Sequence, residues 1–572
     1  SALGANTTGA SNTAVGFNSL CANTTGSANT AIGQAALDAL TTGSNNTAVG
    51  SSAGTSITEG ANNLALGKSA LVFTTTGDHN IALGEDSVRC NTTGDYNIGI
   101  GVNALQKNTG NSNVGIGRNA AACNTTASGN IAVGDNAFCK NTTGTANTAI
   151  GVQALSWNTT TNCNTAVGYN ALTFNNGAEN TAVGVNALYN NSSGDAGNTA
   201  VGAHALCSNL GNYNVAVGYK SLVLNTTGAC NVAIGNITMC TNTTGAKNLA
   251  MGSCTMEENI SGNDNVALGY ATLRCNTTTN GNVAIGYASL NVNVQAANTA
   301  VGYYSGIANT SGGNNTFIGF CNGRCNTTGT CNTALGFCAL HCNTTGNAQT
   351  ALGWCALRLA AGASNNNTAV GHAAGCSITL GDGNVMLGYQ AAGSTTTGTR
   401  NVAIGDSAGM DAAGTNNSIS IGYAVTSIVN AVTFGNSTTD SRIAFGATSI
   451  TAPSDMRLKE DIQDDTAGLS FINDLRPVTY KWRQEKDIPE EMRTHVAGST
   501  KRYNNDKVNH GFIAQEVKEA IDKHPELKDG FDMWTEESTM DGRQRVAEGA
   551  LIPMLVNAIK ELTKRIKDLE DK

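Results

Sequence analysis

The chain has 572 residues, of which 13% are charged and 5% are aromatic, and its formal net charge at pH 7 is −9. Both parts of the chain carry a net negative charge and no basic stripe is present, so we do not expect nucleic acid as a partner. No apolar run reaches the roughly 18 residues that a membrane-spanning helix needs, which argues against a membrane span.

Charge is distributed unevenly between the two ends of the chain. Residues 1–453 contain 12 Lys or Arg and 16 Asp or Glu, whereas the shorter part from 454 to 572 contains 20 and 25. So sharp a change in charge density predicts a domain boundary near residue 453.

A five-residue phrase, Asn-x-Ala-(Val/Ile/Leu)-Gly, recurs throughout residues 1–422. Residues 214–218 read NVAVG and residues 231–235 read NVAIG, and the closing glycine returns twenty-five times, from Gly16 to Gly422, at a spacing of 17 that slips only to 16 or 18. A period this short cannot contain a helix pair or a propeller blade, so each unit is expected to be one coil of a parallel β-solenoid. Gly4 precedes Gly16 by only 12 residues, which indicates an incomplete first coil.

Each phrase is expected to form a strand whose two faces are both apolar. Alternation places Thr13 and Val15 on one face and Ala14 on the other. A strand buried on both faces needs two covers. The opposite wall of the coil is one, and a neighbouring subunit is the expected other, which favours an oligomer wound around a common axis with the alanine face at the tighter contact. Phe317 and Met386 occupy the alanine position, where they predict local widening of the coil.

The remainder of each coil is expected to contain a second strand and a turn. Ala-Leu follows the glycine, as at 36–37, 104–105 and 187–188, and predicts a second short strand. The turn phrase NTTG follows, in which Asn and Gly adopt positive φ at low cost. Asn and Thr ladders are then expected along the outside of a rod about 120 Å long.

All 17 cysteines lie before residue 377, and Cys321, Cys338 and Cys355 are expected to form a ladder on three successive coils. The plainer interpretation is small buried side chains that stay reduced, and disulfides between chains or between coils are the alternative. No paired CxxC or paired His pattern indicates a metal site. We expect no metal and no cofactor.

The NTT triplets, for example at Asn141 and Asn242, are formal glycosylation sequons, but their recurrence is explained by the turn alone. No carboxylate pair recurs on the coils, so no catalytic activity of the rod is supported. The repeat resembles the head repeats of YadA-like trimeric autotransporter adhesins, which form a trimeric left-handed parallel β-roll. That resemblance implies a trimer as well.

Beyond the repeat, residues 423–453 read as a neck of more widely spaced strands, followed by three motifs. These are SDMRLKEDI (454–462), HGFIAQEV (510–517) and ALIPMLVNAIKELTKRI (550–566). Together they resemble the intramolecular chaperone of phage and viral tail fibres, the peptidase S74 or endosialidase-type chaperone. The resemblance implies a domain that assists trimerisation and then cuts the bond between Pro453 and Ser454.

The residues of the first motif fit that chemistry. A serine hydroxyl is a weak nucleophile until a base takes its proton, and a lysine is such a base only where burial lowers its pKa. Ser454 is therefore the expected nucleophile and Lys459 the expected base of a single-turnover serine endopeptidase. His510 is expected to orient or polarise the site. Gly511, Gln515 and Glu516 match the second motif.

The last helix, expected over residues 550–572, has an apolar heptad pattern. Ile552, Ile559 and Ile566 fall at position a, and Leu555, Leu562 and Leu569 at position d. Ile at a with Leu at d favours two strands, which conflicts with the trimer. We favour the trimer because three heptads are a weak determinant beside twenty-five coils. The alternative is a helix packed on its own domain.

These observations predict a mainly β chain. A trimeric β-solenoid (1–422) and a neck (423–453) precede a small α+β chaperone domain (454–572) that ends in a coiled-coil helix. The expected function is a homotrimeric fibre or spike, a virion appendage made in the host cytoplasm, that contacts a host surface receptor or glycan. The alternatives are a cellular or secreted adhesin at the extracellular surface and a structural or ice-binding rod.

Overall fold

A computed structural model describes the chain except for residues 363, 448–449, 452–453, 455, 457–458, 491, 493, 528–530, 532 and 537–543. The chain divides into two compact units, Ser1–Pro453 and Ser454–Lys572. The boundary between them is the peptide bond for which the sequence predicts cleavage.

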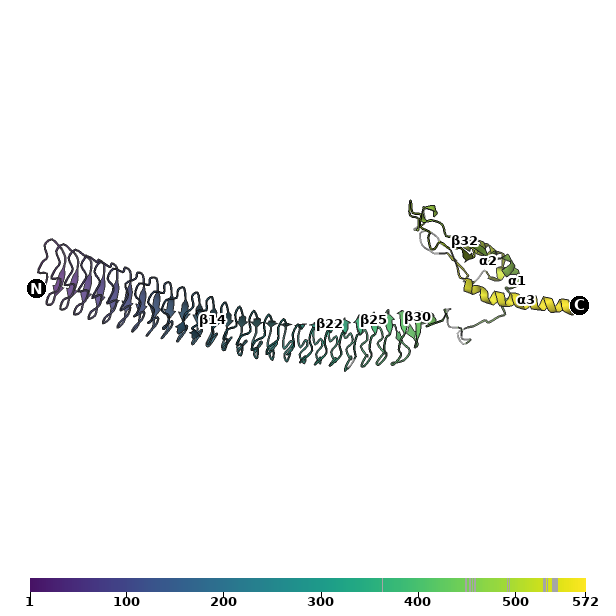
Figure 1. Cartoon of the computed structure of the whole chain (residues 1–572), viewed down its shortest axis with the longest axis horizontal. Helices are drawn as coiled ribbons and strands as arrows, with labels where there is room; N and C mark the ends of the chain where they lie inside the picture. Colours follow the sequence, from purple (N-terminus) through teal and green to yellow (C-terminus); the bar gives the residue numbers. More distant parts are fainter. Residues whose placement is uncertain are drawn as a thin grey trace. The chain divides into compact units, whose positions relative to one another are not determined.

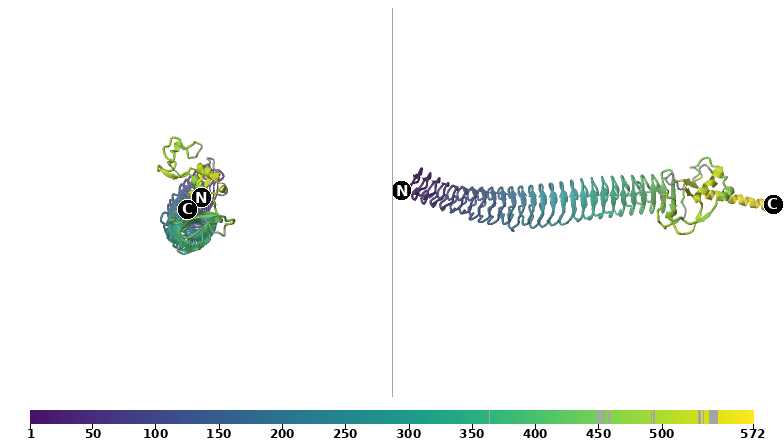
Figure 2. Two further views of the ribbon diagram at one scale, coloured as in Figure 1. Left: turned by 90° about the vertical axis from the view of Figure 1, so that its right-hand side faces the viewer. Right: turned by 90° about the horizontal axis from the view of Figure 1, so that it is seen from above.

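The first unit is a parallel β-solenoid, with one short strand on each of the repeat phrases (Figure 1). Stacking of the coils along one axis makes this unit a gently curved rod (Figure 2). The phrase strands are β1 (Thr13–Val15), β2 (Thr30–Ile32), β3 (Thr47–Val49), β4 (Leu64–Leu66), β5 (Ile81–Leu83), β6 (Ile98–Ile100), β7 (Val114–Ile116), β8 (Ile131–Val133), β9 (Thr148–Ile150), β10 (Thr165–Val167), β12 (Thr181–Val183), β14 (Thr199–Val201), β15 (Val215–Val217), β16 (Val232–Ile234), β17 (Leu249–Met251), β18 (Val266–Leu268), β19 (Val283–Ile285), β20 (Thr299–Val301), β21 (Thr316–Ile318), β22 (Thr333–Leu335), β23 (Thr350–Leu352), β24 (Thr368–Val370), β25 (Val385–Leu387), β26 (Val402–Ile404) and β28 (Ile419–Gly422).

Each phrase strand pairs in parallel with the strand of the next coil, alanine beside alanine, as for Ala216 and Ala233. The closing glycine makes this close stacking feasible. Gly50 has a φ of +139°, and a Cβ built on it would lie only 2.5 Å from the carbonyl oxygen of Gly67 on the next coil. A side chain at this position would therefore meet backbone that cannot move, which explains the glycine in every copy.

The alanine of each phrase faces the interior of its own coil. Ala216 and Ala233 are fully buried there. The leucine four positions after the closing glycine packs in the same interior, as Leu37 does. The residue before the closing glycine points outward and stays partly exposed, with Leu335 at 47%. We call this row of Val, Ile, Leu and Met side chains along the rod the outward rail.

The expected second strand at the Ala-Leu positions is wrong. Residues 36–37, 104–105 and 187–188 form turns, and Leu37, Leu105 and Leu188 have φ values of +50°, +52° and +46°. A left-handed conformation costs a non-glycine residue roughly 1–2 kcal/mol. Complete burial of a leucine side chain contributes about 1.5–3 kcal/mol, which offsets that cost. Short strands outside the repeat phrases do occur in a few coils. They are β11 (Phe174–Asn175), β13 (Asn190–Asn191), β27 (Gly409–Met410) and β29 (Thr426–Ser427).

The asparagine ladders run inside the rod and not along its outside, which corrects the expectation. Asn231 is fully buried; its backbone N–H donates to Asn214 Oδ1 at 2.9 Å, and its own Oδ1 accepts from the backbone N–H of Asn248 at 3.0 Å. Each asparagine thus satisfies a buried N–H of the next coil. The asparagines of the turn phrase form a second ladder inside the rod. The sequon residues Asn141 and Asn242 belong to it and are buried, so glycosylation cannot reach them in the folded rod.

Phe317 and Met386 fit the coil by compensation from the opposite wall. Gly323 stands where most coils have leucine, and a Cβ there would lie 2.5 Å from Phe317 Cε1. Gly375, on the coil before Met386, is as close to that side chain, since a Cβ there would lie 2.5 Å from Sδ. A large residue on one wall is therefore matched by a glycine on the other, so the expected widening is replaced by an exchange of volume.

The cysteines of the rod are all free thiols. Cys321, Cys338 and Cys355 occupy equivalent positions on three successive coils, as expected. Burial raises the pKa of the Cys338 thiol, and its neighbours Cys321 and Cys355 raise it further. Three other thiols, those of Cys163, Cys230 and Cys331, are exposed.

At the end of the rod the sheet continues beyond the last repeat phrase. β30 (Ala431–Gly435) still pairs in parallel with β28, and β31 (Asp440–Ala444) then turns back antiparallel to β30. With β31 the sheet contains 27 strands among the described residues. The antiparallel hairpin ends the stack, because it leaves no free parallel edge at which a further coil would add.

The second unit is a small α+β domain. Its helices are α1 (Leu469–Asp474), α2 (Ala514–Lys523) and α3 (Ile552–Glu570), with short 3-10 turns η2 (Glu485–Asp487), η3 (Pro525–Leu527) and η4 (Glu548–Leu551). Two antiparallel pairs complete it, β32 (Val478–Tyr480) with β33 (Asn509–Gly511) and β34 (Trp534–Glu536) with β35 (Gln544–Val546).

The core of this domain includes Phe471 of α1, Val517 and Ile521 of α2, and Met554 of α3. The C-terminal part of α3 projects beyond the domain (Figure 1). In the part of the chain that the structure describes, no helix combines the length and the hydropathy needed to cross a bilayer.

Candidate Ser-Lys site of the C-terminal unit

Ser454 and Lys459 lie side by side at the start of the second unit. Lys459 Nζ donates a hydrogen bond to Ser454 Oγ at 2.8 Å. A backbone turn accounts for the approach, because the N–H of Lys459 donates to the carbonyl of Met456 at 3.1 Å. The five-residue spacing in the sequence therefore corresponds to a direct contact between the two reactive groups.

This contact is the geometry that a serine nucleophile and a lysine base require. Both side chains are solvent-exposed in the single chain. A lysine gives up its proton readily only when its ammonium group is desolvated, so the pair lacks the cover that a working dyad needs. Pro453, on the other side of the predicted scissile bond, lies outside the described residues.

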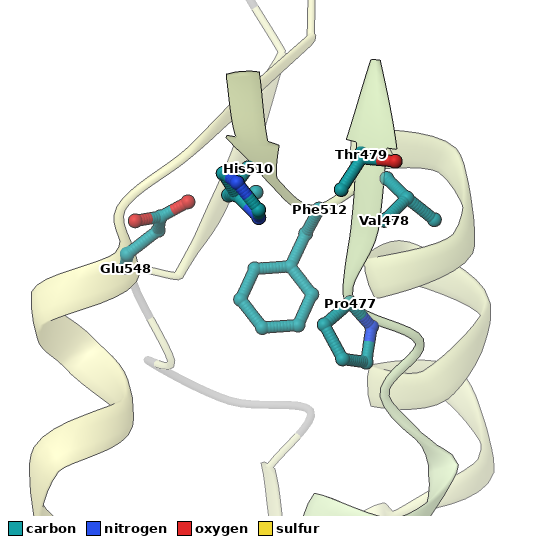
Figure 3. A pocket seen from close by; sticks show the side chains of 7 residues that line it. Pro477, Val478, Thr479, His510, Phe512 and Glu548 are labelled. Atoms are coloured by element: carbon teal, nitrogen blue, oxygen red, sulfur yellow. The ribbon is translucent and has the colours of Figure 1, made fainter. Parts of the chain in front are cut away.

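His510 lies in a separate pocket of about 460 Å³. In Figure 3 it stands between Glu548 on one side and Thr479 and Val478 of β32 on the other, with the ring of Phe512 beside it. Among the described residues, no hydrogen bond joins the His510 side chain to Ser454 or Lys459. The structure therefore shows the pair without the histidine, and a catalytic role of His510 stays a prediction.

The other residues of the second motif have structural contacts. Glu516, in the first turn of α2, forms a two-point ion pair with Arg476, in which Nε donates to Oε2 at 3.0 Å. The hydrogen bond from Arg476 lowers the pKa of the Glu516 carboxyl. Gly511 faces Glu548, since a Cβ there would lie 3.2 Å from Oε1. Gln515 is exposed on α2.

The apolar heptad residues of α3 form an exposed stripe, which we call the α3 stripe. Its members are between 42% and 71% exposed, whereas Met554 and Ala558 on the other face are buried. Asn557 on that other face donates to the carbonyl oxygens of Asp465 and Ala467. The helix thus packs on its own domain through one face and leaves the heptad face open. The stripe consists of Ile552, Leu555, Ile559, Leu562, Ile566 and Leu569.

Two features of this unit were not indicated by the sequence. Glu548 reaches the His510 pocket from η4, and His524 is held between Asp474 and Glu526. A charged residue directly before the apolar helix was the only signal for Glu548. His524 has no signal, because Asp474 lies 50 residues away. Within the described residues, no three His, Cys, Asp or Glu side chains are placed to hold a metal ion.

Comparison with known protein families gives a match in this unit. Residues 454–525 match the family Peptidase_S74, described as chaperone of endosialidase. The match ends before α3, so it is shorter than the resemblance seen in the sequence. No curated protein and no solved structure matches the chain. The second unit of this chain thus matches the chaperone of endosialidase from Ser454 to Pro525, behind a β-solenoid of 17-residue coils.

Proposed function

We propose that the chain is a homotrimeric fibre or spike whose C-terminal unit drives assembly and then removes itself by cutting between Pro453 and Ser454. The observation that carries this proposal is the 2.8 Å contact between Lys459 Nζ and Ser454 Oγ. Ser454 is also the first residue of the family match and the first residue of the second unit. Three independent features therefore coincide at one peptide bond.

The proposed cleavage uses Ser454 as the nucleophile and Lys459 as the base. Ser454 Oγ attacks the carbonyl carbon of Pro453 while Lys459 takes the hydroxyl proton, and the Pro453–Ser454 C–N bond breaks as the leaving amine gains a proton. The product is an ester between the Pro453 acyl group and Ser454 Oγ. Water then hydrolyses this ester, which releases a Pro453 carboxylate and a free Ser454 amine.

Assembly is supported by apolar surface that the single chain leaves uncovered. The α3 stripe presents six large side chains to solvent, and the outward rail does the same along the rod. Contiguous exposed apolar surface of this extent is typical of an interface between chains. Parallel solenoids side by side would cover the rail, while parallel copies of α3 would cover the stripe.

The exposure of Ser454 and Lys459 connects cleavage with assembly. A neighbouring chain that covers the pair would desolvate the Lys459 ammonium and favour its neutral, basic form. Cleavage would then follow trimer formation, so the chaperone is released only after it has acted. The remaining rod fits the proposed role of a virion appendage, made in the host cytoplasm, that binds a receptor or glycan on a host surface.

The test compares the wild-type chain with Ser454→Ala and Lys459→Ala on denaturing gels, followed by N-terminal sequencing of any fragment. The wild type should yield a fragment that begins at Ser454. Ser454→Ala should abolish that fragment, and Lys459→Ala should slow its appearance by about 100-fold or more, the usual contribution of a general base.

Two exposed residues of the same domain serve as matched controls. Ser470→Ala and Lys523→Ala remove a serine and a lysine outside the pair, and both variants should be cut at the wild-type rate. If the wild type stays intact although it forms trimers, the domain is a chaperone without protease activity. Cleavage of Ser454→Ala at the wild-type rate would exclude this serine as the nucleophile.

A further inference from the structure

Eight aromatic side chains form a continuous row on the outside of the rod, which we call the aromatic ladder. Each follows the closing glycine of its coil, and neighbouring ring centroids lie 4.9 to 5.5 Å apart. At one coil per strand spacing, the ladder extends over about 34 Å. Its members are Tyr270, Tyr287, Tyr303, Phe320, Phe337, Trp354, His372 and Tyr389.

The ladder is not needed to pack the coils. Its seven Phe, Tyr and Trp members are between 42% and 52% exposed. In four of the N-terminal coils the same position holds a charged residue, and these residues pair along the rod as Lys68 with Glu85 and Arg118 with Asp135. The position therefore faces solvent, and the aromatic side chains represent a local change of surface chemistry.

A groove runs beside the ladder. Near its start, a pocket of about 380 Å³ is lined by Tyr270, Tyr287 and Tyr304 and by Glu257, Arg274 and Asn291. The floor of this pocket is formed two positions after the closing glycine by the small side chains of Cys254, Ala271 and Ala288, and Tyr304 takes this position on the next coil. Further along the rod, Cys321, Cys338 and Cys355 take the same floor position.

The wall opposite the ladder, formed by the side chains five positions after each closing glycine, carries Glu257 at its start and arginines further along. Residues 265–381 contain three arginines and no Lys, Asp or Glu, in a chain whose net charge is −9. Arg274 pairs with Glu257, whereas Arg324 and Arg358 form no ion pair with any described residue. Arg324, His341 and Arg358 take the same position on three successive coils, since the N–H of Cys325 donates to the carbonyl of His341 and the N–H of Cys342 to that of Arg358. Burial lowers the pKa of His341, and Arg324 and Arg358 lower it further. This wall therefore favours an anionic ligand.

Trp354 is the one ring of the ladder that is turned. Phe320 and Phe337 stack with an interplanar angle of 4°, so their faces cover each other. Trp354 stands at 90° to Phe337 and at 84° to His372, which turns one indole face away from its neighbours. Arg358 stands five positions after the closing glycine of the coil of Trp354, the position that Arg274 takes in the pocket beside Tyr270. Burial raises the pKa of the adjacent Cys355 thiol, and Arg358 lowers it.

We propose that this groove binds an acidic polysaccharide, a chain of uronic-acid pyranoses, with one sugar on the free face of Trp354 and its carboxylates on Arg358 and Arg324. The inference rests on the proposed role of the rod in surface attachment and names the ligand class. The C–H face of a pyranose suits an aromatic face, and carboxylate pairs with guanidinium in a bidentate manner.

Other occupants fit the groove less well. Single-stranded nucleic acid binds aromatic platforms by base stacking on open ring faces, and most faces of the ladder are covered by neighbouring rings. A second copy of this chain would have to bury Arg324 and Arg358, and these have no acidic partner among the described residues. Burial of an unpaired charge is strongly unfavourable.

The test measures retardation of the intact wild-type chain in native gels that contain polygalacturonate, with dextran gels as the neutral reference. The apparent Kd of Trp354→Ala and of Arg358→Gln should rise about tenfold, which corresponds to ~1.4 kcal/mol. The controls are Tyr169→Ala, an exposed aromatic residue at the ladder position outside the ladder, and Arg89→Gln, which takes the position of Arg358 in an earlier coil. Both should change the Kd by less than about twofold, within the usual effect of a surface substitution.

Several outcomes would overturn the inference. Equal retardation of the wild type in dextran, no retardation in either gel, or the same loss in the control variants would each exclude a polysaccharide site here. So would equally effective displacement by a single-stranded oligonucleotide, or a change of oligomeric mass in Trp354→Ala, which would make the ladder an interface between chains. Cleavage at Ser454 is scored on the same samples, so failure of the proposed self-processing is seen separately from loss of binding.

Discussion

His524 is held almost fully buried between two carboxylates. Its Nε2 lies 2.9 Å from Asp474 Oδ2 of α1, and its Nδ1 lies 3.0 Å from Glu526 Oε1 of η3. Phe471 packs edge-on against the ring. A ring with a carboxylate at each nitrogen must donate twice, which only the imidazolium can do. Burial lowers the pKa of His524, but the hydrogen bonds to Asp474 and Glu526 outweigh this effect and raise it overall.

Because the folded pKa of His524 is raised, the second unit should be most stable while this ring is protonated. Its contribution is complete below the unfolded histidine pKa of about 6.5 and is lost as pH rises through the folded pKa. The pKa of Glu526 is lowered by its own backbone hydrogen bond and by His524, so that contribution is lost instead as pH falls. Calorimetric melting of the full chain at pH 6 and pH 9 measures the effect.

His524→Gln should remove the loss of stability between pH 6 and pH 9. His510→Gln, which changes an exposed histidine of the same domain, should retain it. If the wild type and His524→Gln lose the same stability between pH 6 and pH 9, a group other than His524 causes the loss.

At the scale of the element, each coil keeps a fixed interior volume. Phe317 replaces the usual alanine of its strand, and Gly306 and Gly323 replace the usual leucines beside it; Cβ atoms on these glycines would lie 2.9 and 2.5 Å from the phenyl ring. Neighbouring coils set the separation of the two walls, so one coil cannot expand alone. Residues that look like exceptions in the repeat are therefore paired across the coil.

Gly323→Leu should disrupt this coil alone but not together with Phe317→Ala. Overpacking costs typically 1–3 kcal/mol, and the φ of +53° at Gly323 matches the +51° of Leu340 in the same position. The double variant restores the usual Ala and Leu pair, so it should show a coupling of roughly 0.5–3 kcal/mol. Hydrogen exchange of peptides from residues 302–340 measures it locally.

The matched control combines Phe317→Ala with Gly375→Leu. Gly375 faces Met386 and not Phe317, so these two effects should add. If the free-energy effects also add for Phe317→Ala with Gly323→Leu, Phe317 and Gly323 do not compensate for each other.

At the scale of the whole molecule, the single chain leaves two apolar surfaces exposed to solvent. The rod buries alanine and leucine inside each coil, while its outward rail and the α3 stripe stay exposed. The second unit buries the opposite face of α3 against α1. Each unit therefore has its own core. The outward rail runs along the rod and the α3 stripe runs along its helix, so identical copies could cover each surface by associating in parallel.

Ile559→Asp combined with Ile566→Asp should prevent assembly and leave a folded single chain of 58.3 kDa. Both side chains are exposed in the single chain, so the change costs little there, whereas a carboxylate buried in a coiled-coil core is strongly unfavourable. Light scattering after size-exclusion chromatography measures the mass. Thr563→Asp adds a carboxylate outside the stripe and should assemble normally. Trimers of the double Ile variant would place the driving contacts in the rod alone.

The sequence by itself determined the period, the number of coils, the need for glycine and the pairing of alanine with alanine, because these follow from chain spacing and stacking. The resemblance of the first motif also paired Ser454 with Lys459, and the structure adds the direct contact between their side chains. The sequence could not decide which face of the strand points inward, because both faces are apolar. Only the tertiary structure turned the asparagines inward, matched Phe317 with Gly323, and joined His524 to Asp474, since these contacts link positions whose separation along the chain leaves no local pattern. The aromatic ladder depends on both. Its period is present in the sequence, but the stacking of its rings and the turned ring of Trp354 require the coils to be in register.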